Sequence, residues 1–190
     1  MELEEDKKQP SPPEEDVQEL DDEEEKYVSL QYGGKTVVKL RLHDVYFSEP
    51  KRLDSGKAHV HSEVVRVALE ADKHANEITI PPIQNKYGAT PQQISKTFQT
   101  LEWFLNTHSA PLTLPSIPVQ KSFADNEVAK ELFRRIPEMA VLYTLLDLGN
   151  FLSIDALIQF VCAGVALKIN VCPLDSIKST LGDMSSPFEL

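Results

Sequence analysis

The sequence is poor in the features on which several classes of protein depend. It has 2 cysteines and 7 glycines among 190 residues, and no apolar run approaches the roughly 18–20 residues that a membrane-spanning helix needs. Two cysteines make no disulfide framework, and the amino-terminal stretch MELEEDKK lacks the apolar segment of a secretory signal. We therefore expect no membrane contact and a reducing compartment, the cytoplasm and/or the nucleus.

The chain also lacks an excess of positive charge. It carries 30 acidic and 19 basic side chains, a formal net charge of −11, and 13 of the acids lie in residues 1–25 beside two lysines. Residues 26–190 hold 17 side chains of each sign and are neutral. A neutral body offers no basic footprint for phosphate backbones, so we expect no nucleic-acid partner.

Residues 1–25 are predicted to be a disordered acidic tail. They contain few aliphatic side chains and cluster three prolines among like charges, which is too little apolar surface to offset the entropy of ordering. The tail is either a solvating segment or an arm for a basic partner such as a histone. It can also screen residues 26–135, which carry 15 basic and 11 acidic side chains, in a salt-dependent way.

Motifs for catalysis or cofactor binding are missing. The glycine pair at 33–34 belongs to no phosphate-binding pattern, and His59 and His61 have no cysteine near them in the sequence. Cys162 is expected on the inward face of a helix, and Cys172 beside a proline in a turn, without a nearby histidine or lysine to activate either thiol. We expect no metal, no cofactor and no enzymatic activity.

The first regular element is a β-hairpin over residues 27–41, in which apolar and polar residues alternate on both sides of the glycine pair. A three-residue loop at 32–34 would place Val28 opposite Val38. Residues 43–60 show no period and are predicted to be an irregular insertion. The hairpin therefore begins a small sheet.

Mostly helical segments follow. We predict a helix capped by Ser62 and a short strand at 77–80. We also predict a helix over 90–108 that opens with the Thr90-Pro91-Gln92-Gln93 capping pattern. An extended connector at 109–122 precedes helices at 123–135, 137–149 and 154–169, and a short segment at 174–181. This order predicts an α+β fold in which helices cover a small sheet.

The stretch LYTLLDLGNFLSIDALIQFVCAGVALKI resembles the Skp family, the F-box adaptors of SCF ubiquitin ligases. In that family a leucine-rich helix ends in an Ala-Asn-Tyr-Leu-Asp-Ile-type bend and is followed by a helix with a single cysteine. The matching residues here are Asn150, Phe151, Leu152 and Ile154 in the bend and Cys162, Val165, Ala166 and Ile169 in the following helix. The order of the upstream elements is also similar.

The resemblance implies a BTB/POZ-like fold over residues 26–169 and a short, truncated F-box-binding-type extension over 170–190. It implies a non-catalytic adaptor that bridges a cullin amino-terminal domain and an F-box protein. Asn150 and Phe151 would contact the cullin; the alternative is that Asn150 caps a helix and Phe151 packs inward. The F-box face would comprise an apolar stripe that could equally be intramolecular core, formed by Leu157, Val161, Val165, Ile169, Ile177 and Leu181.

Three departures from the family pattern leave a second function open. In the bend, Phe151 stands where the family usually has tyrosine and Ser153 where it has aspartate. Leu181 replaces an aromatic residue of the family. The family continues into a helix, usually bearing a tryptophan, that clasps the F-box, whereas this sequence stops at Leu190. The alternative function is a BTB-like structural scaffold, or a self-associating module that forms a homodimer and has lost ligase assembly.

Overall fold

The structure is a computed structural model that describes residues 25–47, 53–83, 87–116 and 119–170. The predicted tail, apart from its last residue, lies outside these ranges. The whole predicted extension beyond residue 170 also lies outside them, including Cys172, Ile177 and Leu181. The described part is an α+β fold, as the order of patterns in the sequence predicts.

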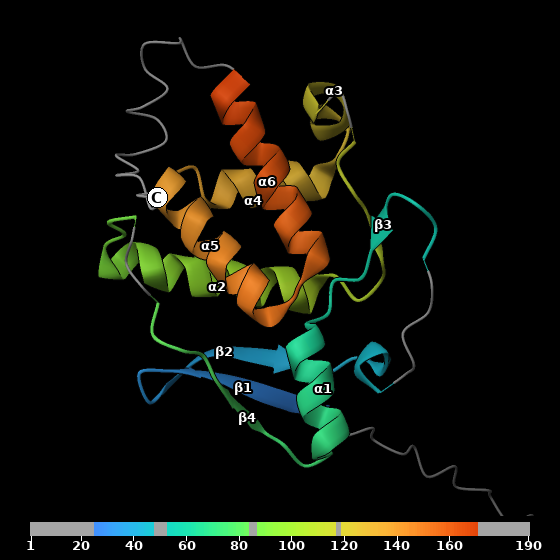
Figure 1. Ribbon diagram of the computed structural model, residues 1–190, viewed down its shortest axis with the longest axis vertical. Coiled ribbons are helices and arrows are strands. Elements are labelled where there is room, and N and C mark those ends of the chain that lie inside the picture. The colour runs from blue at the N-terminus through green and yellow to red at the C-terminus, as the bar shows by residue number, and fades with distance from the viewer. Residues whose placement is uncertain (1–24, 48–52, 84–86, 117–118, 171–190) are drawn as a thin grey trace, which may run out of the picture.

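Three strands form the main sheet at one end of the molecule (Figure 1). They are β1 (Tyr27–Tyr32), β2 (Lys35–Arg41) and β4 (Glu77–Thr79), in the order β2-β1-β4. β1 pairs antiparallel with β2 and parallel with β4. A parallel pair needs a crossover, and the chain makes it through the short 3-10 helix η1 (Asp44–Tyr46), β3 (Lys57–Ala58) and helix α1 (Glu63–Ala71).

The predicted hairpin is confirmed, but its predicted register is wrong. The turn has two residues, Gly33 and Gly34, with φ of +58° and +75°. Val28 is paired with Leu40, two residues beyond its expected partner, and the register shifts after Leu30. This irregularity lets a tight glycine turn and two aligned apolar faces coexist, because the extra residue offsets the shorter loop.

Six α-helices are present in the described residues. The cap of α1 is confirmed, since the Ser62 hydroxyl accepts a bond from the Val65 amide at 3.2 Å. The capping box of α2 is confirmed at Thr90 and Gln93. The single helix expected over 123–135 is instead two, because Asn126 caps a new helix. After α1 the helices are α2 (Pro91–Thr107), α3 (Val119–Ala124), α4 (Glu127–Arg135), α5 (Met139–Leu152) and α6 (Asp155–Asn170).

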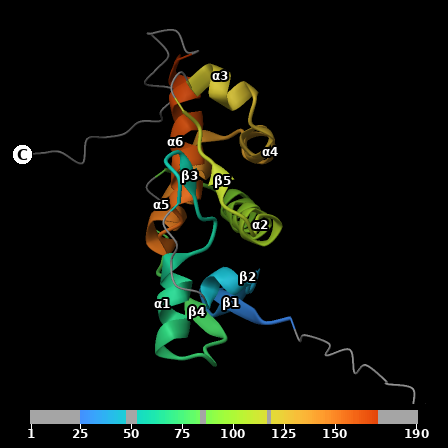
Figure 2. The same cartoon turned by 90° about the vertical axis from the view of Figure 1, so that its right-hand side faces the viewer.

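Helix α1 lies beside the sheet, and the helices that follow it stack away from the sheet (Figure 1). α2 lies across the sheet end of the molecule, α5 and α6 lie beyond it, and α3 is at the opposite end (Figures 1 and 2). A second, two-stranded sheet of β3 with β5 (Leu112–Thr113) runs beside α6. One continuous core joins these layers, and its largest fully buried side chains include Phe104, Phe160, Leu30, Leu40, Leu101, Leu132, Ile136, Leu142, Leu145 and Leu152.

The outer edge of β2 is covered by α2. The Lys39 amide donates to the Glu102 carboxylate at 2.9 Å, and the Arg41 amide donates to the Asn106 side-chain oxygen at 2.8 Å. The Asn106 amide group donates in turn to the Lys39 carbonyl at 2.8 Å. Polar side chains of a helix thus satisfy an edge strand that would otherwise be free to pair with another chain.

Candidate interaction surface at the α5–α6 bend

The bend between α5 and α6 is made by a left-handed residue. Ser153 has φ of 52° and ψ of 57°, and it is the one non-glycine residue with positive φ in the described part of the chain. The Ser153 amide donates to the Asn150 carbonyl at 3.2 Å, and the Ile154 amide to the Gly149 carbonyl at 2.9 Å. These bonds satisfy the last carbonyls of α5 and fix a sharp turn. The helix end or bend expected at Gly149-Asn150 lies a few residues further along the chain, because α5 continues to Leu152.

The predicted cullin-contact residues lie together on the surface of this bend. Phe151 is 37% exposed, and Asn150 beside it is also exposed. Both residues belong to the last turn of α5, and the left-handed cap is Ser153. The alternative in which Asn150 caps the helix and Phe151 packs inward is therefore wrong.

Ser62, at the start of α1, holds the bend in place from the interior of the protein. This residue is fully buried, and its hydroxyl donates to the Leu152 carbonyl at 2.7 Å. Its own amide donates to the Tyr46 hydroxyl at 3.3 Å, and the neighbouring Glu63 amide donates to the Ser153 carbonyl at 3.4 Å. Burial raises the pKa of Tyr46 to about 12, so the phenol stays protonated. One serine thus ties η1, α1 and the bend together.

Charged side chains of α1 surround this anchor. Arg66 bonds to Glu63 and Glu70 on the same helix. The hydrogen bond from Arg66 is the main reason that the pKa of Glu63 lies below its ordinary value. A cleft of about 420 Å³ adjoins the bend, and its polar and charged lining includes Lys57, His59, His61, Glu63, Ser153 and Asp155.

The predicted F-box face is divided by the structure. Leu157 and Val161 have no exposed surface, so their alternative assignment, intramolecular core, is the one that their burial supports. Leu157 reaches α5, where one of its methyl carbons lies 3.5 Å from the position of a Cβ on Gly149. Val165 and Ile169 are partly exposed in the last turns of α6. Neither Leu157 nor Val161 is available to a partner in this conformation.

Cys162 does not occupy the inward face of α6. The structure places it on the exposed side, so the prediction of a buried thiol is wrong. Partial desolvation raises the pKa of this thiol above its ordinary value. A thiol with a raised pKa is mostly protonated at neutral pH and is a weak nucleophile.

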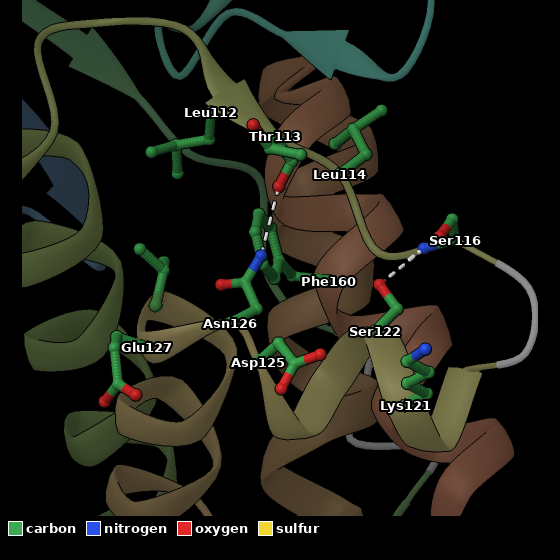
Figure 3. A pocket seen from close by; sticks show the side chains of 11 residues that line it. Leu112, Thr113, Leu114, Ser116, Lys121, Ser122, Asp125, Asn126, Glu127 and Phe160 are labelled. Carbon is green, nitrogen blue, oxygen red and sulfur yellow. Dashed lines mark hydrogen bonds between the residues drawn. The ribbon is translucent and has the colours of Figure 1, made fainter.

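A second hollow lies away from the bend, between β5 and the start of α3 and α4 (Figure 3). It has a volume of about 750 Å³, and Phe160 lies among its lining residues. The Asn126 side chain donates to the Thr113 carbonyl at 3.1 Å, and the Ser116 amide donates to the Ser122 hydroxyl at 2.8 Å. The first bond satisfies a carbonyl of β5, and the second ties the segment that follows β5 to α3.

The described residues contain no arrangement of three or more His, Cys, Asp or Glu side chains that could hold a metal ion. Among the helices that the structure describes, none combines the length and the apolar character of a bilayer crossing. Comparisons of the chain with models of known protein families, with characterised proteins and with solved structures find no match. A functional proposal therefore depends on the geometry of the bend and on the resemblance in its sequence.

Proposed function

We propose that this protein is a non-catalytic adaptor with a BTB/POZ-like core. It bridges a cullin amino-terminal domain and an F-box protein in an SCF-type E3 ubiquitin ligase. The observation that carries the proposal is the exposure of Phe151 beside Asn150 on the α5–α6 bend. This is the position at which the sequence resembles the cullin-contacting segment of the Skp family.

The packing around the bend supports a docking role. Interfaces draw most of their binding energy from a few anchors, and aromatic side chains are prominent among them. Phe151 lies two residues before a left-handed cap and next to Leu152, whose carbonyl accepts the buried hydrogen bond from Ser62. An anchor that is already held in place loses little conformational entropy when a partner binds, so more of the contact energy appears as affinity.

The arrangement of elements also supports the proposal. A three-stranded sheet with one parallel pair lies at one end, and the helices that follow it are stacked beyond (Figure 1). A small sheet flanked by helices is the architecture expected for a BTB/POZ-like fold.

We place the F-box-binding face toward the carboxyl end of α6. Leu157 and Val161 are in the core, which leaves Val165 and Ile169 among the described candidates. These two residues are four apart and so lie on the same side of the last helical turns. Ile177 and Leu181 lie beyond the described residues and remain candidates for the rest of this face.

Binding of the full-length chain to an immobilised cullin amino-terminal domain, measured by biolayer interferometry, tests the proposal. Phe151→Ala is expected to weaken the affinity about tenfold or more, the usual loss when an interface anchor is truncated. Phe47→Ala is the matched control, because Phe47 is 50% exposed but follows η1. It is expected to bind like the wild type. Equal affinity of Phe151→Ala and wild type, or no cullin binding at all, would refute the proposal.

Self-association is a second candidate, and one observation favours it. Val67 on α1 is an apolar side chain that the described residues leave 51% exposed. Light scattering of the purified chain separates the two functions. A stable dimer that binds neither the cullin domain nor an F-box peptide supports the scaffold, and a monomer that binds both supports the adaptor.

A further inference from the structure

Four of the chain's five histidines converge on one small cavity. They come from three separate segments: His43 precedes η1, His59 and His61 lie between β3 and α1, and His108 ends α2. All four line the same cavity of about 10 Å³, room for one water at most. Residues that are 65 positions apart in the sequence therefore meet at a single place beside the α5–α6 bend.

Three of these imidazoles have a buried nitrogen without a hydrogen-bond partner among the described residues. They are Nε2 of His43, Nδ1 of His61 and Nε2 of His108. The His61 side chain is only 7% exposed. A buried imidazole can lack one partner at modest cost while it is neutral, but a positive charge at the same place is strongly disfavoured.

Aromatic rings and the carboxylate of Glu63 face the cluster. Aromatic rings surround two of the imidazoles: Tyr46 lies 5.7 Å from His61, and Trp103 and Phe104 lie 5.4 and 5.5 Å from His108. These rings present low-dielectric surface, and both His61 and His108 must lose water to pack against them. Protonation of either imidazole is therefore resisted by its surroundings.

Charged neighbours act mainly on His61. The Glu63 carboxylate of α1 lies 3.6 Å from His61 Nε2 and favours its protonation, whereas His59, at 4.9 Å between ring centres, and Arg66 oppose it. The adjoining cleft also presents Lys57 of β3 and Asp155 of α6. Arg41 and Asp44 lie with His43 in a neighbouring cleft. Burial is the main cause that lowers the pKa of His61, and it also lowers the pKa of His108.

The cluster is directly coupled to the bend. His61 precedes Ser62, whose hydroxyl holds the Leu152 carbonyl and whose amide donates to Tyr46. Tyr46 in turn lies edge-on to His61. A movement of His61 toward solvent would therefore pull on each bond that fixes α1 to the end of α5.

We propose that this histidine cluster is a proton-sensitive lock on the α5–α6 bend. While His61 and His108 are neutral, the cavity stays closed and Ser62 holds the bend against α1. When protons bind, His61 and His108 seek water, the segment at 59–62 opens, and the bend loosens. The lock is a property of the free, folded chain and needs no partner. A second consequence, weaker docking of a partner through Phe151 at low pH, rests on the proposed function.

The direction of the pH dependence follows from the lowered pKa values. An unfolded histidine titrates near about 6.5, and the folded-state values of His61 and His108 lie below their ordinary value. The unfolded chain thus binds protons first as the pH falls. The stability that neutral His61 and His108 contribute is fully present above about pH 6.5. It is lost as the pH falls from there through their pKa values in the folded chain.

Amide hydrogen exchange and tryptophan fluorescence of the full-length chain, in buffer with EDTA, test the lock without any partner. Between pH 7.5 and 5.5 the protection factors of the Glu63 and Val65 amides are expected to fall about tenfold, while those in the middle of α2 stay constant. Trp103 is the chain's single tryptophan and packs against His108, so its emission should change over the same range. Constant protection at Glu63 and Val65 would overturn the proposal.

Variants identify the histidines responsible. His108→Phe and His61→Phe keep a ring of similar size and remove the titrating group, so each should flatten the pH profile of amide protection. His74→Gln is the matched control, because His74 is exposed and lies outside the cavity. It should keep the wild-type profile. If His61→Phe fails to fold, His108→Phe decides; a wild-type profile in His108→Phe, or a flattened one in His74→Gln, would refute the lock.

Discussion

Phe151 at the α5–α6 bend and the apolar stripe of α6 were both expected to face partners, but the structure gives them different environments. Phe151 on the bend is 37% exposed, whereas Leu157 and Val161 on the stripe have no exposed surface. The difference shows that apolar residues which recur at helical spacing mark the core, whereas Phe151, which lies off the buried face of α5, keeps exposed surface.

Helix geometry explains why the two segments differ. Leu157, Phe160, Val161 and Gly164 recur at intervals of three and four, so they share one face of α6. That face meets Phe104 of α2 and Phe133 of α4. Phe151 lies in the last turn of α5, two residues before the left-handed Ser153, and is not among the buried residues of that helix.

Val161→Glu should give the largest effect. The substitution places a carboxylate at a fully buried site with no designed partner, which costs on the order of 4 kcal/mol or more of unfolding free energy. We expect a chain that is largely unfolded at 25 °C, observed by urea denaturation and circular dichroism.

Gln159→Glu is the matched control for this prediction. It adds the same carboxylate to the same helix, but Gln159 is exposed. Its unfolding free energy should stay within about 0.5 kcal/mol of the wild type. A stable, folded Val161→Glu protein would show that the stripe is accessible, and the contrast with the bend would be lost.

Gly164→Ala should have the next largest effect, because α6 approaches α4 closely at this glycine. A Cβ built there would lie 1.3 Å from Cζ of Phe133, so the ring must move. Phe133 also packs edge-on against Phe123, with 4.9 Å between ring centres. Overpacking of this kind typically costs about 1–3 kcal/mol, which chemical denaturation measures directly.

Gly149→Ala, on the neighbouring helix α5, is not expected to destabilise the protein, in contrast to Gly164→Ala. A Cβ on Gly149 would lie 3.4 Å from Ile158 and 3.5 Å from Leu157, close to ordinary contact. Alanine is also favoured over glycine in a helix interior by up to about 1 kcal/mol. Gly149→Ala should therefore be neutral or stabilising. Equal destabilisation by both substitutions would contradict the close approach of α4 and α6.

Local signals in the sequence predicted much of this fold. Ser62 and the Thr90-Pro91-Gln93 pattern placed the starts of α1 and α2 because a cap involves neighbouring residues only. The glycine pair at 33–34 placed the hairpin. The α+β class followed from the order of these elements, and the exposed pair Asn150 and Phe151 followed from the resemblance.

The features that the sequence did not predict depend on residues that are far apart in the chain, or on residues whose pattern fits two different structures. The register shift after Leu30 compensates for a turn length that the sequence does not specify. Asn126 is a favourable N-cap, but apolar residues continue at helical spacing on both sides of it. The sequence pattern therefore predicted one helix where the structure has a break before α4. Ser62 holds Leu152, 90 residues away, and His43 meets His108 only because η1 packs beside the end of α2. No local pattern encodes such contacts.

Asn150→Ala combined with Phe151→Ala should have a much smaller effect on stability than Val161→Glu or Gly164→Ala. Phe151 loses some packing, but asparagine and phenylalanine are poorer helix formers than alanine by roughly 0.5 kcal/mol each, and both lie in the last turn of α5. The two terms largely cancel, so the change in unfolding free energy should be about 1 kcal/mol or less. A circular-dichroism melt and a urea titration measure it. A loss as large as that of Val161→Glu would place the pair in the core, because a surface pair that only contacts a partner contributes little to the free chain.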